Sequence, residues 1–177
     1  LNGGYQTIDQ VPNTATTNNI AAAQTAVANT ALSLVTASAT GITAGVTIVR
    51  ADTGATVTGL LAIDGAMTSV GYGSAKTVNM WDPTVAISRA LKITSNGTDT
   101  GIFTVKGYDL YGFPLTEAIT GTSATAATTI AVTGNKAFKY VASITPSGTV
   151  NSTGLIVGTS DTIGLPLRAD RFSELSV

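Results

Sequence analysis

The chain has no histidine and no cysteine among its 177 residues, and only 11% of its residues are charged. Without histidine, a Ser-His-Asp or Cys-His arrangement cannot form, and the commonest general base of enzymes is missing. Without cysteine, a disulfide framework and thiolate metal sites are excluded. We therefore expect no enzyme, no bound cofactor and no metal site.

Basic residues are also scarce, since nine Lys and Arg against ten Asp and Glu give a net charge of −1. A nucleic-acid-binding protein needs a basic patch that neutralises phosphates, and the sequence contains none. No apolar run approaches the roughly 20 residues that span a bilayer. The first residues, LNGGYQTIDQ, lack an initiator Met and the basic segment of a signal peptide, which indicates a processed or partial chain. We expect no nucleic-acid partner, no membrane partner and synthesis in the cytoplasm.

What the chain does contain is threonine, alanine, glycine and valine, with aromatic residues at only 6%. β-Branched side chains fit a pleated, half-buried surface, and glycine favours turns. The length suffices for one domain with a hydrophobic core, or for a domain and an arm. The composition predicts a mainly β protein with small side chains and many turns.

The stretch TATTNNIAAAQTAVANTA, residues 14–31, is nearly low-complexity, and Asp9 is the only charged residue before residue 50. Such composition is typical of a flexible terminus. The alternative is an extended arm that becomes ordered only against a neighbouring subunit. We predict an N-terminal arm at residues 1–30 and a β-sandwich domain at residues 31–177, and a further division near residues 71–84 stays open.

Strand patterns follow one another from residue 31 onward. In ALKITS and IFTVKGY, apolar residues alternate with polar ones, and Asp64-Gly65, Asn96-Gly97 and a glycine-rich loop at residues 71–74 separate the strands. About nine strands with this spacing predict an antiparallel β-sandwich or barrel-like domain. The predicted strands are 32–35, 45–51, 56–63, 90–95, 102–108, 115–120, 129–133, 138–145 and 155–158.

Carboxylates are the remaining source of chemistry, as a glycosidase pair or a calcium site. Asp99 and Asp109 fall in turns at opposite ends of one predicted strand, about 25–30 Å apart, so they cannot share a site. Asp161 is predicted to cap a turn. Glu117 lies inside a predicted strand, and we expect it to face outward and to pair with Lys106.

Aromatic residues gather around residues 103–113 and in the predicted strand at 138–145, whereas Trp81 stands alone. We interpret these rings as core residues and a turn tyrosine. The alternative is a stacking platform for carbohydrate, to which Trp81 would belong.

The stretch ALKITSNGTDTGIFTVKGYDLYGFPLTEAITG, residues 90–121, reads as three strands joined by turns. Together with several other segments it resembles an ordered series of strands and turns in structural proteins of tailed-phage virions, most of all capsid decoration (cement) proteins. The resemblance spans about residues 81 to 167, and the N-terminal half of the chain has no counterpart in it. The other segments are WDP at 81–83, FKYVASITP at 138–146, LIVGT at 155–159 and GLPL at 164–167.

The resemblance implies a non-enzymatic protein on the outer surface of a phage capsid, made in the host cytoplasm. Such a protein bridges subunits of the major capsid protein, through an arm or through strand addition, and stabilises the shell. We expect a homo-oligomer, preferably a trimer, with Ile20, Val27, Leu32 and Trp81 as partner-binding residues. The alternatives are a tail-associated virion protein and a carbohydrate-binding β-sandwich module.

Overall fold

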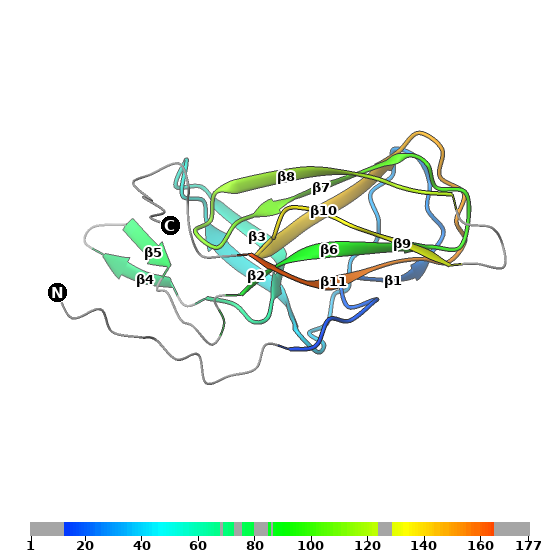
Figure 1. Ribbon diagram of the computed structural model, residues 1–177. Coiled ribbons are helices and arrows are strands. Elements are labelled where there is room, and N and C mark those ends of the chain that lie inside the picture. Colours follow the sequence, from blue (N-terminus) through cyan, green and yellow to red (C-terminus); the bar gives the residue numbers. More distant parts are fainter. Residues whose placement is uncertain are drawn as a thin grey trace, which may run out of the picture.

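The computed structural model describes residues 13–67, 69–72, 76–79, 85, 87–123 and 129–164, and every regular element among them is a β-strand (Figure 1). A four-stranded antiparallel sheet has the order β1-β11-β6-β9, and a five-stranded one has the order β2-β3-β10-β7-β8. β4 and β5 form a separate hairpin. The predicted mainly β, sandwich-like fold is confirmed.

The four-stranded sheet contains β1 (Ala21–Gln24), β6 (Ser88–Ser95), β9 (Ile130–Thr133) and β11 (Leu155–Gly164). The five-stranded sheet contains β2 (Ile42–Val49), β3 (Thr56–Ile63), β7 (Ile102–Tyr108), β8 (Pro114–Thr120) and β10 (Tyr140–Ser147), and the hairpin contains β4 (Ser69–Tyr72) and β5 (Lys76–Asn79).

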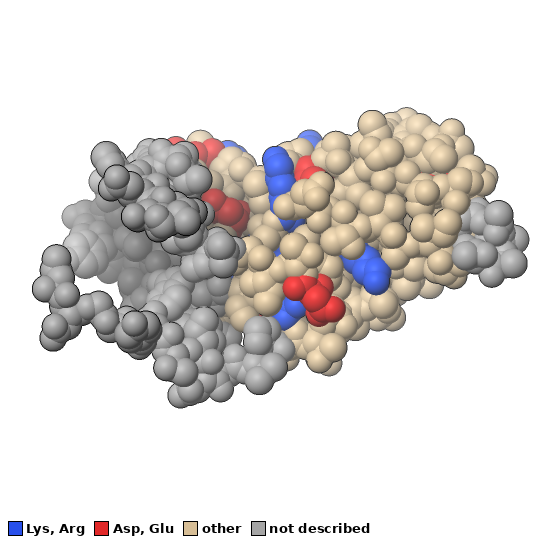
Figure 2. Space-filling model, viewed as in Figure 1, with Lys and Arg blue, Asp and Glu red and all other residues tan. Residues whose placement is uncertain are grey.

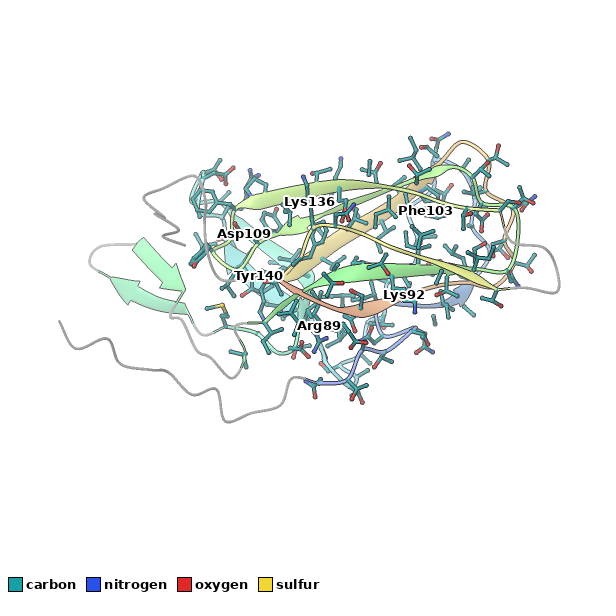
Figure 3. The ribbon with its side chains drawn as sticks, viewed as in Figure 1. Arg89, Lys92, Phe103, Asp109, Lys136 and Tyr140 are labelled. Carbon is teal, nitrogen blue, oxygen red and sulfur yellow. The ribbon has the colours of Figure 1, made fainter. Side chains whose placement is uncertain are left out.

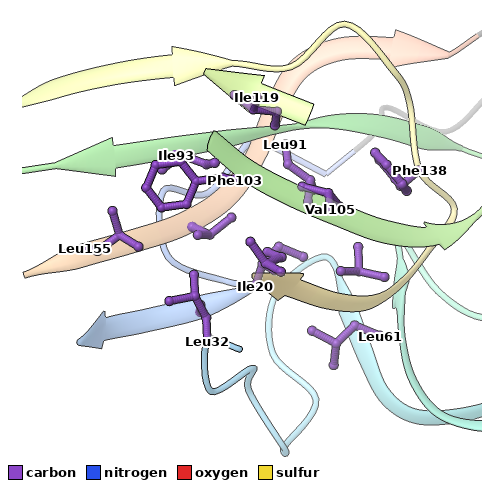
Figure 4. Close-up of a cluster of buried hydrophobic side chains, with 14 of the residues drawn as sticks. Ile20, Leu32, Leu61, Leu91, Ile93, Phe103, Val105, Ile119, Phe138 and Leu155 are labelled. Carbon is purple, nitrogen blue, oxygen red and sulfur yellow. The ribbon is translucent and has the colours of Figure 1, made fainter. Parts of the chain in front are cut away.

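The main core lies between the two large sheets (Figure 4). Leu91 and Ile93 of β6 face Phe103 and Val105 of β7 in this cluster, while the residues between them point outward. The period-two alternation in the sequence predicted this arrangement, since successive side chains of a strand point to opposite faces. Full burial of each such side chain contributes about 1.5–3 kcal/mol.

Residues 20–32 close one side of the sandwich. β1 pairs with β11, and further along the backbone amides of Asn29 and Leu32 donate to carbonyls of β10 at 2.7 and 2.8 Å. The segment therefore crosses from the four-stranded to the five-stranded sheet, and Ile20 and Leu32 lie in the core. From residue 13 onward, the predicted arm is part of the sandwich of its own chain, whereas residues 1–12 lie outside the described residues.

Backbone hydrogen bonds, more than side-chain packing, hold residues 20–35 on the sandwich. The amides of residues 20–35 bond to β10, to β11 and the loop before it, and to one another, so a stretch with few large apolar residues can still be held firmly. The predicted strand at residues 32–35 does not form for the same reason. The Leu32 amide donates to Ile144 and the Val35 amide to Ile20, so no continuous ladder develops.

Ile20 and Val27 give a matched test of this packing, because the first is fully buried and the second is 55% exposed. Replacing Ile20 by Ala should lower the free energy of unfolding by about 2–3 kcal/mol, the lower part of the range for a buried Ile, because small neighbours allow partial collapse. Replacing Val27 by Ala should change it by less than about 0.5 kcal/mol. Urea unfolding followed by circular dichroism measures both values. Equal, small effects would mean that residues 13–31 do not pack on their own chain.

Glu117 lies on β8, at the edge of the five-stranded sheet. The outward orientation predicted for its side chain is wrong. It pairs in register with the core residue Val105, which places its side chain on the inner face of β8. Its Oε1 accepts the backbone amides of Asn135 at 2.5 Å and Lys136 at 3.2 Å, while Lys106 pairs with Thr116 instead. The register of the β7–β8 hairpin decides the face, because a shift of one residue reverses every side chain.

This arrangement also protects the edge of the five-stranded sheet. β8 is the last strand of its sheet, and the Lys136 ammonium donates to the Thr116 carbonyl at 2.8 Å. An inward-pointing charge on the edge strand, and a lysine that already occupies one of its carbonyls, both oppose pairing with a strand of another chain. Strand addition at β8 is therefore disfavoured.

Two further predictions about strand limits need correction. Gly71 and Tyr72, predicted in a loop, belong to β4, where they pair with β5. β10 continues through Pro146 to Ser147, although the prediction ended that strand at residue 145. A proline inside this strand is tolerated because the Pro146 carbonyl accepts the Asn29 amide and so points away from β7. The nitrogen of a strand residue points to the same side as its carbonyl, so the missing N–H removes no bond to β7.

Candidate interaction surface

The two ends of the sandwich differ in charge (Figure 2). One end consists of residues 25–31, 96–102, 120–123 and 146–154, in which Asp99 is the only charged residue. Because Asp99 is fully buried, this uncharged end presents only neutral side chains to solvent. On the face that Figure 2 shows, the visible charged side chains lie over the middle of the sheets and toward the β7–β8 turn.

Small polar side chains dominate the uncharged end, together with two exposed large apolar residues, Val27 at 55% and Ile102 at 44% exposure. A surface of this kind can be covered by a partner without moving an ion out of water, which is costly when the ion remains unpaired. The centres of protein–protein interfaces are depleted of charged residues. The uncharged end is therefore the best candidate for an interaction surface among the described residues.

Asp99 holds the loops of the uncharged end together. Its Oδ1 accepts the backbone amides of Asn151 at 2.7 Å and Ser152 at 3.0 Å, and the Ser95 hydroxyl donates to Oδ2. The Ser152 hydroxyl in turn donates to Asn96 Oδ1 at 2.5 Å. Hydrogen bonds to a carboxylate are stronger than those between neutral groups. The turn after β6 and the loop before β11 therefore form one rigid unit.

A buried ion pair lies on the opposite half of the molecule. Arg89 Nε of β6 donates to Asp64 Oδ2 at 2.6 Å, and the two side chains are only 3% and 4% exposed. The other guanidinium nitrogens donate to the carbonyls of Ser160 at 3.0 Å and Asn13 at 2.5 Å. Arg89 (Figure 3) therefore joins β6 to the end of β3, to β11 and to the N-terminal segment.

Lys139 lies close to this pair and is fully buried. Its ammonium donates to the carbonyls of Ile63, Val85 and Ile87, so all three of its donors are used. Burial lowers the pKa of Lys139 to about 8, against the opposing effect of the Asp64 carboxylate. At neutral pH the side chain is therefore a cation that joins the end of β3 to the backbone at Val85 and Ile87.

Sequence reasoning missed this ion cluster, defined here as Asp64, Arg89 and Lys139. The available signal was a basic residue inside an apolar strand pattern, in SRALKI and in FKYVA. Such a residue is either at a solvent-facing position or paired in the interior. Alternation alone could not decide between these, because the partners come from residues 25 to 76 positions away.

The predicted roles of the other carboxylates have mixed outcomes. Asp109 Oδ1 accepts the amides of Tyr111 and Phe113 at 2.8 and 2.9 Å, which confirms it as a turn residue. Asp99 and Asp109 lie beyond opposite ends of β7, as predicted. Asp161 does not cap a turn but lies inside β11, at an irregularity in the pairing with β6. Across the described ranges, no three acidic residues gather as a metal site would require.

The structure describes three of the four predicted partner-binding residues. Ile20 and Leu32 are core residues, Val27 lies on the uncharged end, and Trp81 lies outside the described residues. The described part of the chain has no helix that is long and apolar enough to cross a membrane. No protein-family model, curated protein or solved structure matches the chain.

Proposed function

We propose that this chain is a structural protein of a tailed-phage particle, and that it binds the outer surface of the capsid through its uncharged end. The observation that carries this proposal is the concentration of neutral side chains at one end of a rigid sandwich, with Val27 and Ile102 exposed there. The likeness of residues 81–167 to virion proteins directs the proposal to a phage particle. In this role the chain needs no catalytic group.

The proposed mechanism is passive stabilisation. A protein that binds only the assembled shell shifts the equilibrium toward that shell by mass action. A copy that touches two neighbouring subunits of the major capsid protein binds the shell more tightly than one that touches a single subunit. The second contact is then intramolecular and has a high effective concentration. We propose a trimer as the bound form, since a symmetric oligomer presents several uncharged ends to the symmetric shell.

The first test is the copy number of the chain in purified particles, relative to the major capsid protein, by quantitative mass spectrometry. One copy per capsid subunit, or a simple fraction such as one third, would support the proposal. A handful of copies per particle would replace it with a tail-associated role. Absence from particles would overturn a virion function of either kind.

A charge at the uncharged end should weaken capsid binding. In Val27→Asp, an unpaired carboxylate would be buried at the interface, and we expect binding to stripped capsids to fall at least tenfold, which corresponds to about 1.4 kcal/mol. Lys106→Glu is the matched control, because Lys106 is exposed on β7 away from this end. Sedimentation of capsids with bound protein measures both variants. Equal binding by Val27→Asp and the native chain would exclude this surface.

A further inference from the structure

A polar pocket of about 460 Å³ lies over the outer face of the four-stranded sheet. Its walls are residues 15–17 of the N-terminal segment, Lys92 of β6, Thr133 of β9 and residues 159–162 of β11. Lys92 pairs in register with Thr133 on one side and with Gly158 on the other, so three strands contribute to one surface. The pocket is separate from the uncharged end.

The N-terminal segment forms a fixed wall of this pocket. The Thr159 amide donates to the Thr16 carbonyl at 3.0 Å, and the Thr16 amide donates back to Thr159 Oγ1 at 3.3 Å. Asn19 Nδ2 also donates to Thr159 Oγ1 at 3.2 Å. A Cβ on Gly158 would lie 1.8 Å from the Thr16 carbonyl oxygen, so only glycine allows the segment to cross β11 this closely.

The lining offers one cation and several hydroxyl groups. The Lys92 ammonium makes no hydrogen bond or ion pair within the described residues, although the side chain is partly buried. Thr133 and Thr162 contribute hydroxyls to the rim. The Ser160 hydroxyl accepts the Thr162 amide at 3.1 Å, which leaves its own proton to donate. This donor-rich lining suits a ligand with acidic oxygen atoms.

One strong acceptor completes the pocket. The Asp161 side chain is 88% exposed, and its carboxylate lies 3.9 Å from Arg89 Nη1. The closest ionic partner of Arg89 is Asp64, which lies 2.6 Å from Arg89 Nε. A carboxylate that faces a pocket accepts hydrogen bonds from ligand hydroxyls. Lys92 and Asp161 are therefore complementary to a ligand that carries an anionic group together with hydroxyl donors.

We propose that this pocket binds an acidic saccharide, with the carboxylate of a uronic acid on the Lys92 ammonium and sugar hydroxyls between the threonines and Asp161. A simple oxyanion would leave most of the volume unused and would meet Asp161 at the rim. An apolar ligand would strip water from Lys92 without replacing it. The volume falls in the range of about 300–1,000 Å³ that is usual for small-ligand sites. The proposal does not rest on the capsid function, because it uses another surface.

The experiment is a titration of the full, ¹⁵N-labelled chain with digalacturonate, followed by amide chemical shifts. We expect saturable shifts at Lys92, Thr133 and Thr162, and at least tenfold weaker binding of a neutral digalactoside. Equal binding of the neutral sugar would overturn the role of the cation. Equal competition by inorganic phosphate would show a simple anion site, and the absence of shifts would overturn the proposal altogether.

Two variants and a control locate the site. Lys92→Met should weaken digalacturonate binding at least tenfold, and Asp161→Asn should weaken it severalfold while leaving the fold intact, because Asp161 is so exposed. Lys106→Met removes an exposed cation from the other sheet and should bind like the native chain. A loss of equal size in Lys106→Met, or native affinity in both pocket variants, would place the binding elsewhere.

Discussion

Replacing Arg89 by Leu is expected to lower the free energy of unfolding by about 3–5 kcal/mol, because it leaves the Asp64 carboxylate buried without its cation. The variant also removes the donors to the carbonyls of Ser160 and Asn13. Buried acceptors without a donor cost additional free energy. Urea unfolding, followed by circular dichroism at neutral pH, measures the loss.

The control is an exposed Arg–Asp pair among the described residues. Arg50 and Asp52 have the same closest separation of 2.6 Å, but their side chains are 30% and 31% exposed. Arg50→Leu should therefore lower the free energy of unfolding far less than Arg89→Leu, because solvent screens an exposed ion pair. The comparison isolates burial, since the two pairs share their chemistry and their distance. Similar losses in both variants would contradict a structural role for the ion cluster.

Alkaline solution is expected to stabilise the protein, through Lys139. The pKa of this ammonium is about 8 in the folded chain, against 10.5 for the unperturbed group. Between these values the unfolded chain binds more protons than the folded one, so the free energy of unfolding rises with pH. The gain across the window is about 3 kcal/mol, because one pKa unit corresponds to about 1.4 kcal/mol. Below pH 8 both states are protonated, and Lys139 contributes no slope.

Unfolding curves from pH 7 to pH 10 test this prediction in three proteins. Lys139→Met should lose the rise, and Lys106→Met should keep it, because Lys106 is exposed. Burial raises the pKa of Tyr140, so ionisation of that tyrosine in the unfolded chain opposes the gain above about pH 10. A flat profile in the native protein would show that Lys139 is not desolvated.

The local sequence determined the strands whose side chains alternate and the turns that separate them. The predicted strands at 56–63 and 102–108 coincide with β3 and β7, and Asp109 forms the turn that its neighbours indicated. These features depend on residues within one strand or turn, where period two and turn chemistry act directly. The sandwich architecture followed from the number and spacing of such strands.

Only the tertiary structure decided which neutral segments and which charges are buried. Residues 20–32 pack against the sandwich because carbonyls of β10 and β11 accept their amides, and no composition reveals that pairing. Glu117 faces inward through its register with Val105. Arg89 and Lys139 are buried because distant segments provide acceptors for them. The sequence by itself specified local periodicity, whereas the partners of amides and ions were set by contacts between strands far apart in the chain, since hydrogen bonds and ion pairs are satisfied in space.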